Sequence, residues 1–263
     1  DTTSFVEVQI DKLKLDVNLL HFNKALFHDV EIQHLELKEQ IDLHYIKAKG
    51  QGGDYYFENI KINNLDDGYS ILTKGELNRI SVDKLLYEFD DFEQTYINSN
   101  QIKGEISSAF KASFFINPSK SFDLKSLTFN SDNSFQHVKL IDYNYIAEIV
   151  DYFDESMITR NIVDIPYYKQ KSKKIIFKPF RNNMSFKDGK LNISPTYLEN
   201  NMLNLNLKGT QTTSDSVDYY MSFNWKEIKK RNKKEKEDYL EEKEEIKELF
   251  LRITGHIDDL NYR

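Results

Sequence analysis

The run Leu-Asn-Leu-Lys-Gly-Thr at residues 205–210 returns as Leu-Arg-Ile-Thr-Gly-His at residues 251–256, and both runs alternate apolar and polar side chains. Residues 217–223 alternate in the same way after a polar turn. Successive side chains of a β-strand point to opposite faces, so this alternation predicts half-buried strands. The glycine near the end of each repeated run predicts a bend or bulge there. Residues 203–262 therefore predict strand, strand, charged insert, strand, strand.

The apolar residues of these closing strands have a common parity. Neighbouring strands bring directly opposed side chains onto one face of a sheet, so we expect the apolar side chains to share a face. The residues concerned are Leu203, Leu205, Leu207, Met221, Phe223, Leu251 and Ile253.

The first half of the chain also alternates, which predicts further strands. The apolar positions of residues 6–10 and 13–19 have opposite parity, so a bulge or turn is expected at Asp11-Lys12. The glycine-rich residues 49–53 and the run Asp-Asp-Gly at 66–68 predict hairpin turns. Residues 71–80 are expected to form a strand that bends at Gly75, and residues 101–115 a pair of strands around Gly104. Further short strands are expected at residues 124–129, 175–177, 184–186 and 191–193.

Two segments have helical spacing. Val82, Leu85, Leu86, Phe89 and Phe92 predict an amphipathic helix with Ser81 as its N-cap. Ile146, Ile149, Val150 and Phe153 predict a second one. The strand pattern is expected to be interrupted at Ser194-Pro195.

The insert at residues 226–248 is rich in Lys and Glu, with its basic residues first and its acidic residues later. That order opposes the helix macrodipole. Its few apolar residues are too sparse for a coiled coil. We interpret it as a solvated helical or hairpin insert in preference to a binding arm.

Composition restricts the function. The chain has 263 residues, 39% hydrophobic and 13% aromatic residues, a net charge of −7 and no cysteine. Thiol catalysis, disulfides and cysteine-bound metals are excluded, and the charge does not favour nucleic-acid binding. No apolar run reaches the roughly 20 residues that span a membrane, and no signal peptide is evident at Asp1.

Catalytic patterns are weak. The six histidines lack metal-ligand spacing, and adjacent acids such as Asp66-Asp67 and Asp258-Asp259 are expected in turns. No Gly-x-Ser-x-Gly elbow occurs. We predict no enzymatic activity, no metal and no cofactor.

The closing repeat resembles the C-terminal region of AsmA-family proteins of the Bacteroidetes type. Matching positions are Gly209, Thr210, Tyr219, Leu249, Phe250, Leu251, Ile253, Gly255 and Asp258. Gln211 stands where many relatives have His, and the insert lacks the glycines that relatives often carry. A second resemblance lies in Gly75, Leu85-Leu86, Phe89, Phe92, Gln94-Thr95 and Ile102-Lys103-Gly104.

The resemblance implies a mainly β fold. We expect a twisted, curled antiparallel sheet forming a taco-like apolar groove, with two short amphipathic helices and the charged insert. Residues 1–263 would be a single domain, the C-terminal part of a longer chain. Groove candidates are Leu13, Leu15, Val17, Ile41, Leu43, Leu203, Leu205, Leu207, Met221, Phe223, Leu251 and Ile253.

The resemblance also implies a non-enzymatic envelope role. The groove would bind acyl chains and support phospholipid transport between inner and outer membranes, or outer-membrane biogenesis. The protein would be periplasmic, anchored to the inner membrane through an N-terminal transmembrane segment outside this sequence, with lipids and other envelope proteins as partners. The alternative is a structural or assembly module of an envelope complex, with a closed β-sandwich and no lipid.

The insert gives a first prediction. Replacing residues 229–245 by a short Gly/Ser linker should leave the thermal unfolding midpoint nearly unchanged, because these residues offer little apolar surface to bury. A large drop in the midpoint would show that the insert packs on the sheet.

Overall fold

The computed structural model describes residues 14–22, 24–37, 40–65, 67–93, 97–117, 122–157, 159–161, 163–228 and 248–263. The predicted strand at residues 6–10, the parity change at Asp11-Lys12 and Leu13 lie outside these residues. Residues 229–247 of the charged insert also lie outside them. The linker prediction for the insert therefore stays a prediction.

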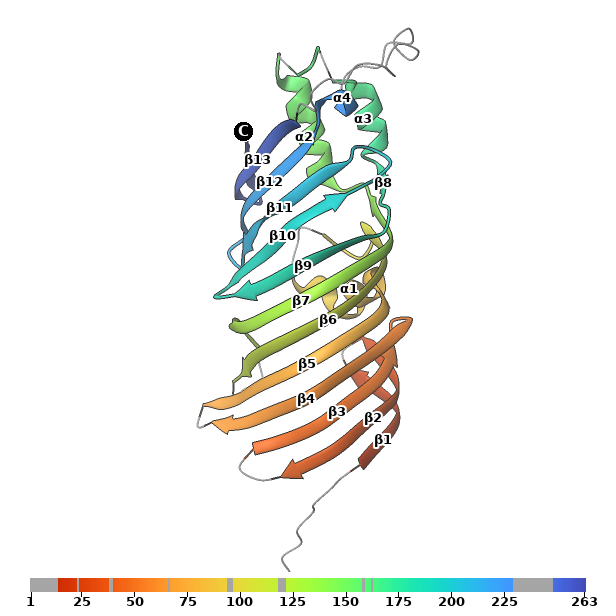
Figure 1. Cartoon of the computed structure of the whole chain (residues 1–263), viewed down its shortest axis with the longest axis vertical. Helices are drawn as coiled ribbons and strands as arrows, with labels where there is room; N and C mark the ends of the chain where they lie inside the picture. The colour runs from red at the N-terminus through yellow and green to blue at the C-terminus, as the bar shows by residue number, and fades with distance from the viewer. Residues whose placement is uncertain are drawn as a thin grey trace, which may run out of the picture. The chain divides into compact units, whose positions relative to one another are not determined.

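The described residues form one antiparallel sheet of fourteen strands (Figure 1). The strands pair in chain order, except that β8 lies off this path and pairs with β7. Their bounds are β1 Lys14–Phe22, β2 Ala25–Leu37, β3 Gln40–Gly50, β4 Gly53–Leu65, β5 Gly68–Ser81, β6 Ile102–Ile116, β7 Phe122–Ile141, β8 Lys174–Ile176, β9 Phe180–Lys187, β10 Lys190–Leu198, β11 Leu205–Thr212, β12 Ser216–Asn224, β13 Glu248–His256 and β14 Asp259–Tyr262.

The prediction of a mainly β, antiparallel fold is confirmed. β1 and β14 end the strand order without pairing to each other, so the sheet is not closed. The closed sandwich of the alternative hypothesis is wrong for the described residues. Their strands belong to one continuous hydrogen-bonded sheet, whereas a sandwich needs two sheets that face each other.

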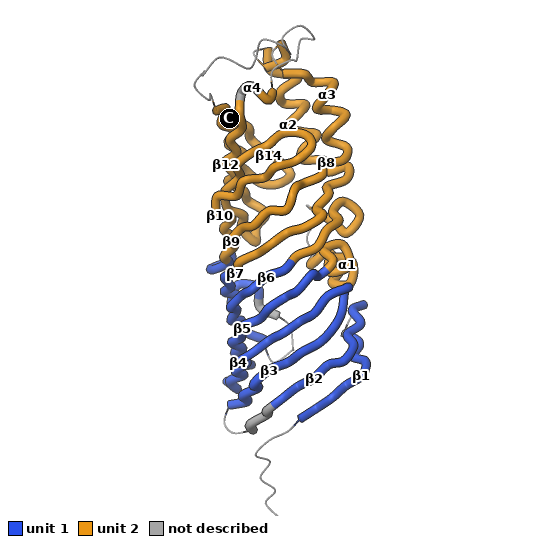
Figure 2. Tube along the Cα trace, turned by 45° about the vertical axis from the view of Figure 1, so that its right-hand side comes forward, with its two compact units in different colours: residues 1–80, 107–131, 186–189 blue, residues 81–106, 132–185, 190–263 orange. Residues whose placement is uncertain are grey.

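The chain divides into two compact units (Figure 2). Unit 1 comprises residues 1–80, 107–131 and 186–189, and unit 2 comprises residues 81–106, 132–185 and 190–263. The long strands β6, β7 and β9 each have residues in both units.

Unit 1 consists of antiparallel strands joined by tight turns. The predicted turns at residues 49–53 and 66–68 are confirmed as the β3–β4 and β4–β5 hairpins. In β4, Tyr55 and Ile60 are both buried although their spacing is odd. Asn59 between them has a φ of +52°, a left-handed conformation that interrupts the alternation of buried positions.

The helices agree only partly with the prediction. Their bounds are α1 Val82–Glu88, η1 Asp90–Glu93, α2 Asn144–Glu155, α3 Ile165–Lys171 and α4 Trp225–Ile228. The second predicted helix is confirmed as α2. The first is correct at its start but wrong beyond Glu88, because Asp90, Asp91 and Phe92 have left-handed φ values of +52°, +53° and +53°. Helix α3 was not predicted.

The Ser81 cap is correct in position but not in chemistry. Ser81 precedes α1, yet its side chain makes no capping hydrogen bond to a helix amide. Its hydroxyl instead donates to Oδ1 of Asp83 at 2.7 Å.

Two strand predictions were wrong, and a third was correct but too short. The strand pair predicted in residues 101–115 is the single strand β6. A Cβ on Gly104 would come within 2.9 Å of Cα of Val138, so this glycine allows a close approach and makes no turn. Residues 124–129 belong to the 20-residue strand β7. The strand does not end at Pro195, because β10 continues through it. The pairing register between β10 and β11 shifts between Ile193 and Thr196. This bulge accommodates a proline, which has no backbone N–H to donate.

The glycines of the closing repeat have different roles. Gly209 does not end its strand but pairs with Tyr219 inside it, and a Cβ there would lie 2.4 Å from the Tyr219 ring and 2.4 Å from the backbone oxygen of Asp218. Gly255 has a φ of +121°, so it supplies a backbone conformation that other residues rarely adopt.

Gly209 gives the second prediction. Gly209→Ala should lower the free energy of unfolding by about 1–3 kcal/mol, because neither the Asp218 carbonyl nor the Tyr219 ring can move without disturbing the β11–β12 pairing. Chemical denaturation would measure the change. The exposed Asn206→Ala on the same strand should change stability by less than about 0.5 kcal/mol. Equal stability of the two variants would contradict the close-approach explanation.

Candidate functional site: an apolar cavity

The register of β11, β12 and β13 puts the predicted apolar residues on one face. Leu205 lies opposite Phe223, and Leu207 lies opposite Met221. Met221 in turn lies opposite Leu251, and Ile253 pairs with Tyr219 of β12. Directly opposed residues of antiparallel strands point to the same side. The prediction of a shared face for these residues is confirmed.

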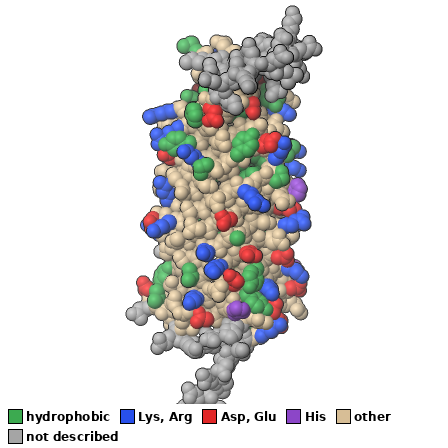
Figure 3. Space-filling model, viewed as in Figure 1, with side chains coloured by type: hydrophobic (Ala, Val, Ile, Leu, Met, Phe, Trp, Pro, Cys, Tyr) green, Lys and Arg blue, Asp and Glu red, His purple; other side chains and the backbone are tan. Residues whose placement is uncertain are grey.

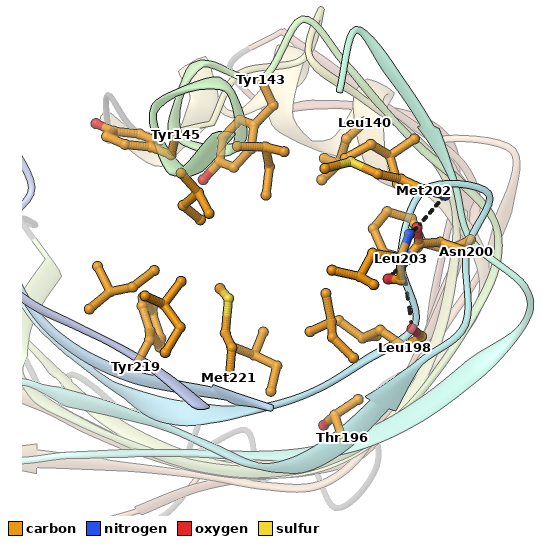
Figure 4. A pocket seen from close by; sticks show the side chains of 18 of the residues that line it. Leu140, Tyr143, Tyr145, Thr196, Leu198, Asn200, Met202, Leu203, Tyr219 and Met221 are labelled. Carbon is orange, nitrogen blue, oxygen red and sulfur yellow. Dashed lines mark hydrogen bonds between the residues drawn. The ribbon is translucent and has the colours of Figure 1, made fainter. Parts of the chain in front are cut away.

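Leu203 reaches the same space from the loop before β11. The side chain of Asn200 closes this loop: its Oδ1 accepts hydrogen bonds from the amides of Met202 at 2.8 Å and Leu203 at 2.9 Å. Its Nδ2 also donates to the carbonyl oxygen of Leu203 at 2.6 Å. The loop thus brings Met202 and Leu203 beside Leu198 of β10 (Figure 4).

Helices α2, α3 and α4 pack against this part of the sheet. The buried core of unit 2 joins α2 and the segment through α3 with Phe223 of β12 and Leu251 of β13, and the helices lie at the same end as these strands in Figure 1. The ring of Phe153 on α2 meets Phe223 edge to face, with 6.2 Å between centroids. Tyr152 stacks on Tyr262 at 5.2 Å.

Polar contacts hold the helices in place. Nζ of Lys169 on α3 lies 3.0 Å from carboxylate oxygens of both Asp151 and Asp154 on α2. The hydroxyl of Tyr168 donates to the carbonyl oxygen of Glu227 on α4 at 2.7 Å. The side chain of Asp164 caps the start of α3. These contacts fix the helices while leaving their apolar sides toward the strands.

A cavity of about 490 Å³ lies between these helices and strands. Figure 4 shows Tyr143 and Tyr145 on one side of it and Tyr219 and Met221 of β12 on the other. Its volume falls within the range of small-molecule sites, about 300–1,000 Å³. The described lining contains no charged residue and is mainly Leu, Ile, Val, Met, Phe and Tyr.

The few polar lining groups are satisfied within the protein. Gln211 accepts a hydrogen bond from the hydroxyl of Tyr219 at 2.9 Å. Asn182 accepts one from Asn133 at 3.2 Å, and the hydroxyl of Thr196 donates to Ser194. No buried side-chain nitrogen or oxygen in the described chain lacks a partner. The cavity therefore favours apolar groups over groups that need hydrogen bonds.

A smaller polar pocket of about 290 Å³ adjoins the cavity. The two share Tyr145, Ile257 and Leu260 in their walls. Its other lining residues are Gln101, Asn144, Glu148 and Asp258. The apolar cavity and the polar pocket are therefore neighbours with a shared wall.

The predicted site residues fall into two groups. Leu203, Leu205, Leu207, Met221, Phe223, Leu251 and Ile253 all line the cavity. Leu15, Val17, Ile41 and Leu43 lie on β1 and β3 of unit 1 and do not line it; Leu15 is 46% exposed. Leu13 lies outside the described residues.

The sequence patterns did not indicate that α3 and strands β7 to β10 contribute to the lining of the cavity. Val163 and Tyr168 line the cavity beside the α2 residues Ile149 and Val150. The signal for α3 was the run Asp-Ile-Pro at residues 164–166, an N-cap residue followed by proline in the first turn. The lining role of Phe135, by contrast, has no periodic signature.

The outer face of the same strands is different. Lys208, Tyr220 and Arg252 lie opposite one another on β11 to β13, with Arg252 4.9 Å from the Tyr220 ring and paired through two hydrogen bonds with Asp218. Charges of both signs are interspersed with small hydrophobic groups over the face seen in Figure 3. Phe250 of β13 is 72% exposed.

Other kinds of site find little support in the part of the chain that is described. No group of three His, Cys, Asp or Glu side chains is arranged to hold a metal ion among those residues. None of the described helices is long and apolar enough to cross a bilayer.

Comparison with protein-family models, with curated proteins and with solved structures gave no match to this chain. The AsmA resemblance therefore stays a prediction from the sequence.

The aromatic contact under α2 gives the third prediction. Phe153→Ala should lower the free energy of unfolding by about 3–5 kcal/mol, because Phe153 is 8% exposed and joins α2 to Phe223. Phe250→Ala, which removes an exposed ring, should change it by less than about 0.5 kcal/mol. Denaturant titration compares the two, and a similar loss in both would mean that α2 is not held by this contact.

Proposed function

We propose that the cavity of unit 2 binds acyl chains, and that the protein takes part in phospholipid transport between the inner and outer membranes or in outer-membrane biogenesis. The observation that carries this proposal is the uncharged, largely aliphatic and aromatic lining of a ligand-sized space. An acyl chain needs no hydrogen bond and gains free energy from leaving water.

The energetics support an acyl ligand. Each buried methylene contributes about 0.8 kcal/mol, so a sixteen-carbon chain gains up to roughly 13 kcal/mol before the entropy lost on binding is subtracted. Leu205, Leu207 and Met221 are only half-buried although they face the cavity. A bound chain would cover this remaining apolar surface.

The proposal includes a taco-like groove. An open antiparallel sheet with one apolar face and few helices leaves much of that face for a ligand. A uniform apolar lining gives a shallow energy profile along the sheet, because neighbouring positions offer an acyl chain similar burial. Such a profile suits movement of a lipid along the sheet better than tight capture at one point.

The cellular setting in this proposal rests on the AsmA resemblance. It places the protein in the periplasm, anchored to the inner membrane by a segment outside this sequence, with lipids and envelope proteins as partners. It assigns no catalytic reaction to the chain. These parts of the proposal are separable from acyl-chain binding, which rests on the cavity itself.

The competing function is an assembly module that holds no lipid. The edge strands β1 and β14 favour it, because the outer edge of a sheet offers backbone groups that can pair with another chain. Native mass spectrometry and organic extraction of the purified protein separate the two functions. Lipid that co-purifies with the chain supports acyl binding, and a lipid-free chain supports the assembly module.

A charge in the cavity gives the fourth prediction. Leu205→Asp and Met221→Asp should abolish lipid co-purification, because an ionised carboxylate beside an acyl chain in this uncharged lining is strongly unfavourable. Both residues are half-buried, so these changes disturb packing less than Phe223→Asp, where the side chain is 5% exposed.

Asn206→Asp is the matched control. Asn206 lies between Leu205 and Leu207 on β11 but is exposed on the opposite face, so its variant should keep its lipid. Circular dichroism should show that all three variants are folded. If the inward and outward variants carry the same amount of lipid, the cavity is not the binding site.

A further inference from the structure

The polar pocket beside the cavity is placed to receive the head of a bound amphiphile. It shares Tyr145, Ile257 and Leu260 with the apolar cavity, so the head of a ligand whose chain lies in the cavity would be close to it. Glu148, Asp258 and Asn144 in its wall are exposed. A head there would remain in contact with water, as a polar group requires.

The charge in this pocket is negative. Glu148 on α2 and Asp258 in the β13–β14 turn both line it, and no Lys or Arg does so among the described residues. Burial raises the pKa of the Tyr145 phenol, and the negative charges of Glu148, Asp258 and Asp215 raise it further. The hydroxyl of Tyr262 donates to Glu148 at 3.2 Å, which orients this carboxylate without neutralising it.

A histidine lies beside one of the two carboxylates. Nδ1 of His256 is 3.5 Å from Oδ2 of Asp258, and it accepts a hydrogen bond from the Asp258 amide at 3.3 Å. The Asp258 side chain itself is 82% exposed, so its carboxylate is in contact with water.

The start of helix α2 opposes the negative charge of the pocket. Helix α2 begins at Asn144, and the start of a helix has a partial positive charge equivalent to about half an elementary charge. Two carboxylates exceed this partial charge. A head that combines a phosphate with an ammonium group can satisfy both, whereas a purely anionic head meets net repulsion.

We propose that the pocket formed by Gln101, Asn144, Tyr145, Glu148 and Asp258 is a headgroup site that favours amphiphiles bearing an ammonium group over anionic ones. This inference rests on the proposed acyl-chain binding and names the class of lipid that the same site prefers. The carboxylates of Glu148 and Asp258 select the ammonium group. The cavity behind them takes the chain whatever the head is.

The size of the preference follows from the exposure of the two carboxylates. An exposed ion pair contributes a factor of roughly 1.5 to 5, so two together predict a preference of roughly 2-fold to 25-fold. Solvent-exposed charges are screened by salt, with a screening length of about 10 Å at 0.1 M and about 3 Å at 1 M. The preference should therefore shrink as the salt concentration rises.

The test is a competition between two lipids. The purified 263-residue protein is mixed with equal amounts of phosphatidylethanolamine and phosphatidylglycerol that carry identical acyl chains, and bound lipid is counted by native mass spectrometry. The wild-type chain should bind more phosphatidylethanolamine, by roughly twofold or more at low salt. The double variant Glu148→Gln with Asp258→Asn should bind the two lipids in equal amounts.

Glu248→Gln is the matched control. It also removes one exposed carboxylate from unit 2, but Glu248 is paired with Asn224 at the start of β13, away from the residues that line the pocket. It should keep the wild-type preference. Gln at position 148 can still accept the hydrogen bond of Tyr262, so the double variant retains this contact.

The possible outcomes distinguish a failure of the headgroup site from a failure of the proposed acyl-chain binding. If the wild-type chain binds lipid but shows no preference, or if the double variant keeps the preference, the headgroup site is wrong and acyl-chain binding stands. If no lipid binds to the wild-type chain, the proposed function fails, and the headgroup site fails with it.

Discussion

Directly opposed side chains of antiparallel strands lie on the same face of a sheet, and the rest of unit 2 depends on this constraint. β11, β12 and β13 place Leu207, Met221 and Leu251 in one row across the sheet. A shift of one residue in any of these pairings would turn that strand's apolar set outward and bring residues such as Lys208 inward. Only this register gives the sheet an apolar face against which helices α2 and α3 can pack. The cavity therefore depends on the same register.

The helices cover the apolar face incompletely. α2 and α3 are short and bury Phe153 and Tyr168 against β12 and β13, yet a space of about 490 Å³ remains beside them. Protein interiors are normally packed so densely that voids larger than a water molecule are few. A space of this size with an apolar lining forgoes dispersion contacts that a ligand could restore. This is the physical argument behind the proposal that the space binds a ligand.

Polarity changes in one direction along the site. Inside the cavity, the polar side chains of Gln211 and Asn182 are occupied by protein partners, so the lining offers mainly hydrocarbon. At the adjoining pocket, Glu148 and Asp258 face water. An amphiphile has the same gradient from chain to head. This correspondence is the basis of the proposal that the cavity and the pocket bind one amphiphile.

The sequence by itself determined the strands, their turns, helix α2 and the common face of residues such as Leu205 and Phe223, because alternation and helical spacing are local properties of the chain. It did not determine the end of α1, the bulge at Pro195 or the passage of β6 through Gly104, where packing and backbone strain override local preference. The cavity and the meeting of Glu148 with Asp258 were decided only by tertiary structure. Periodicity fixes the direction of a side chain on its own element, whereas the space between distant elements depends on how they pack.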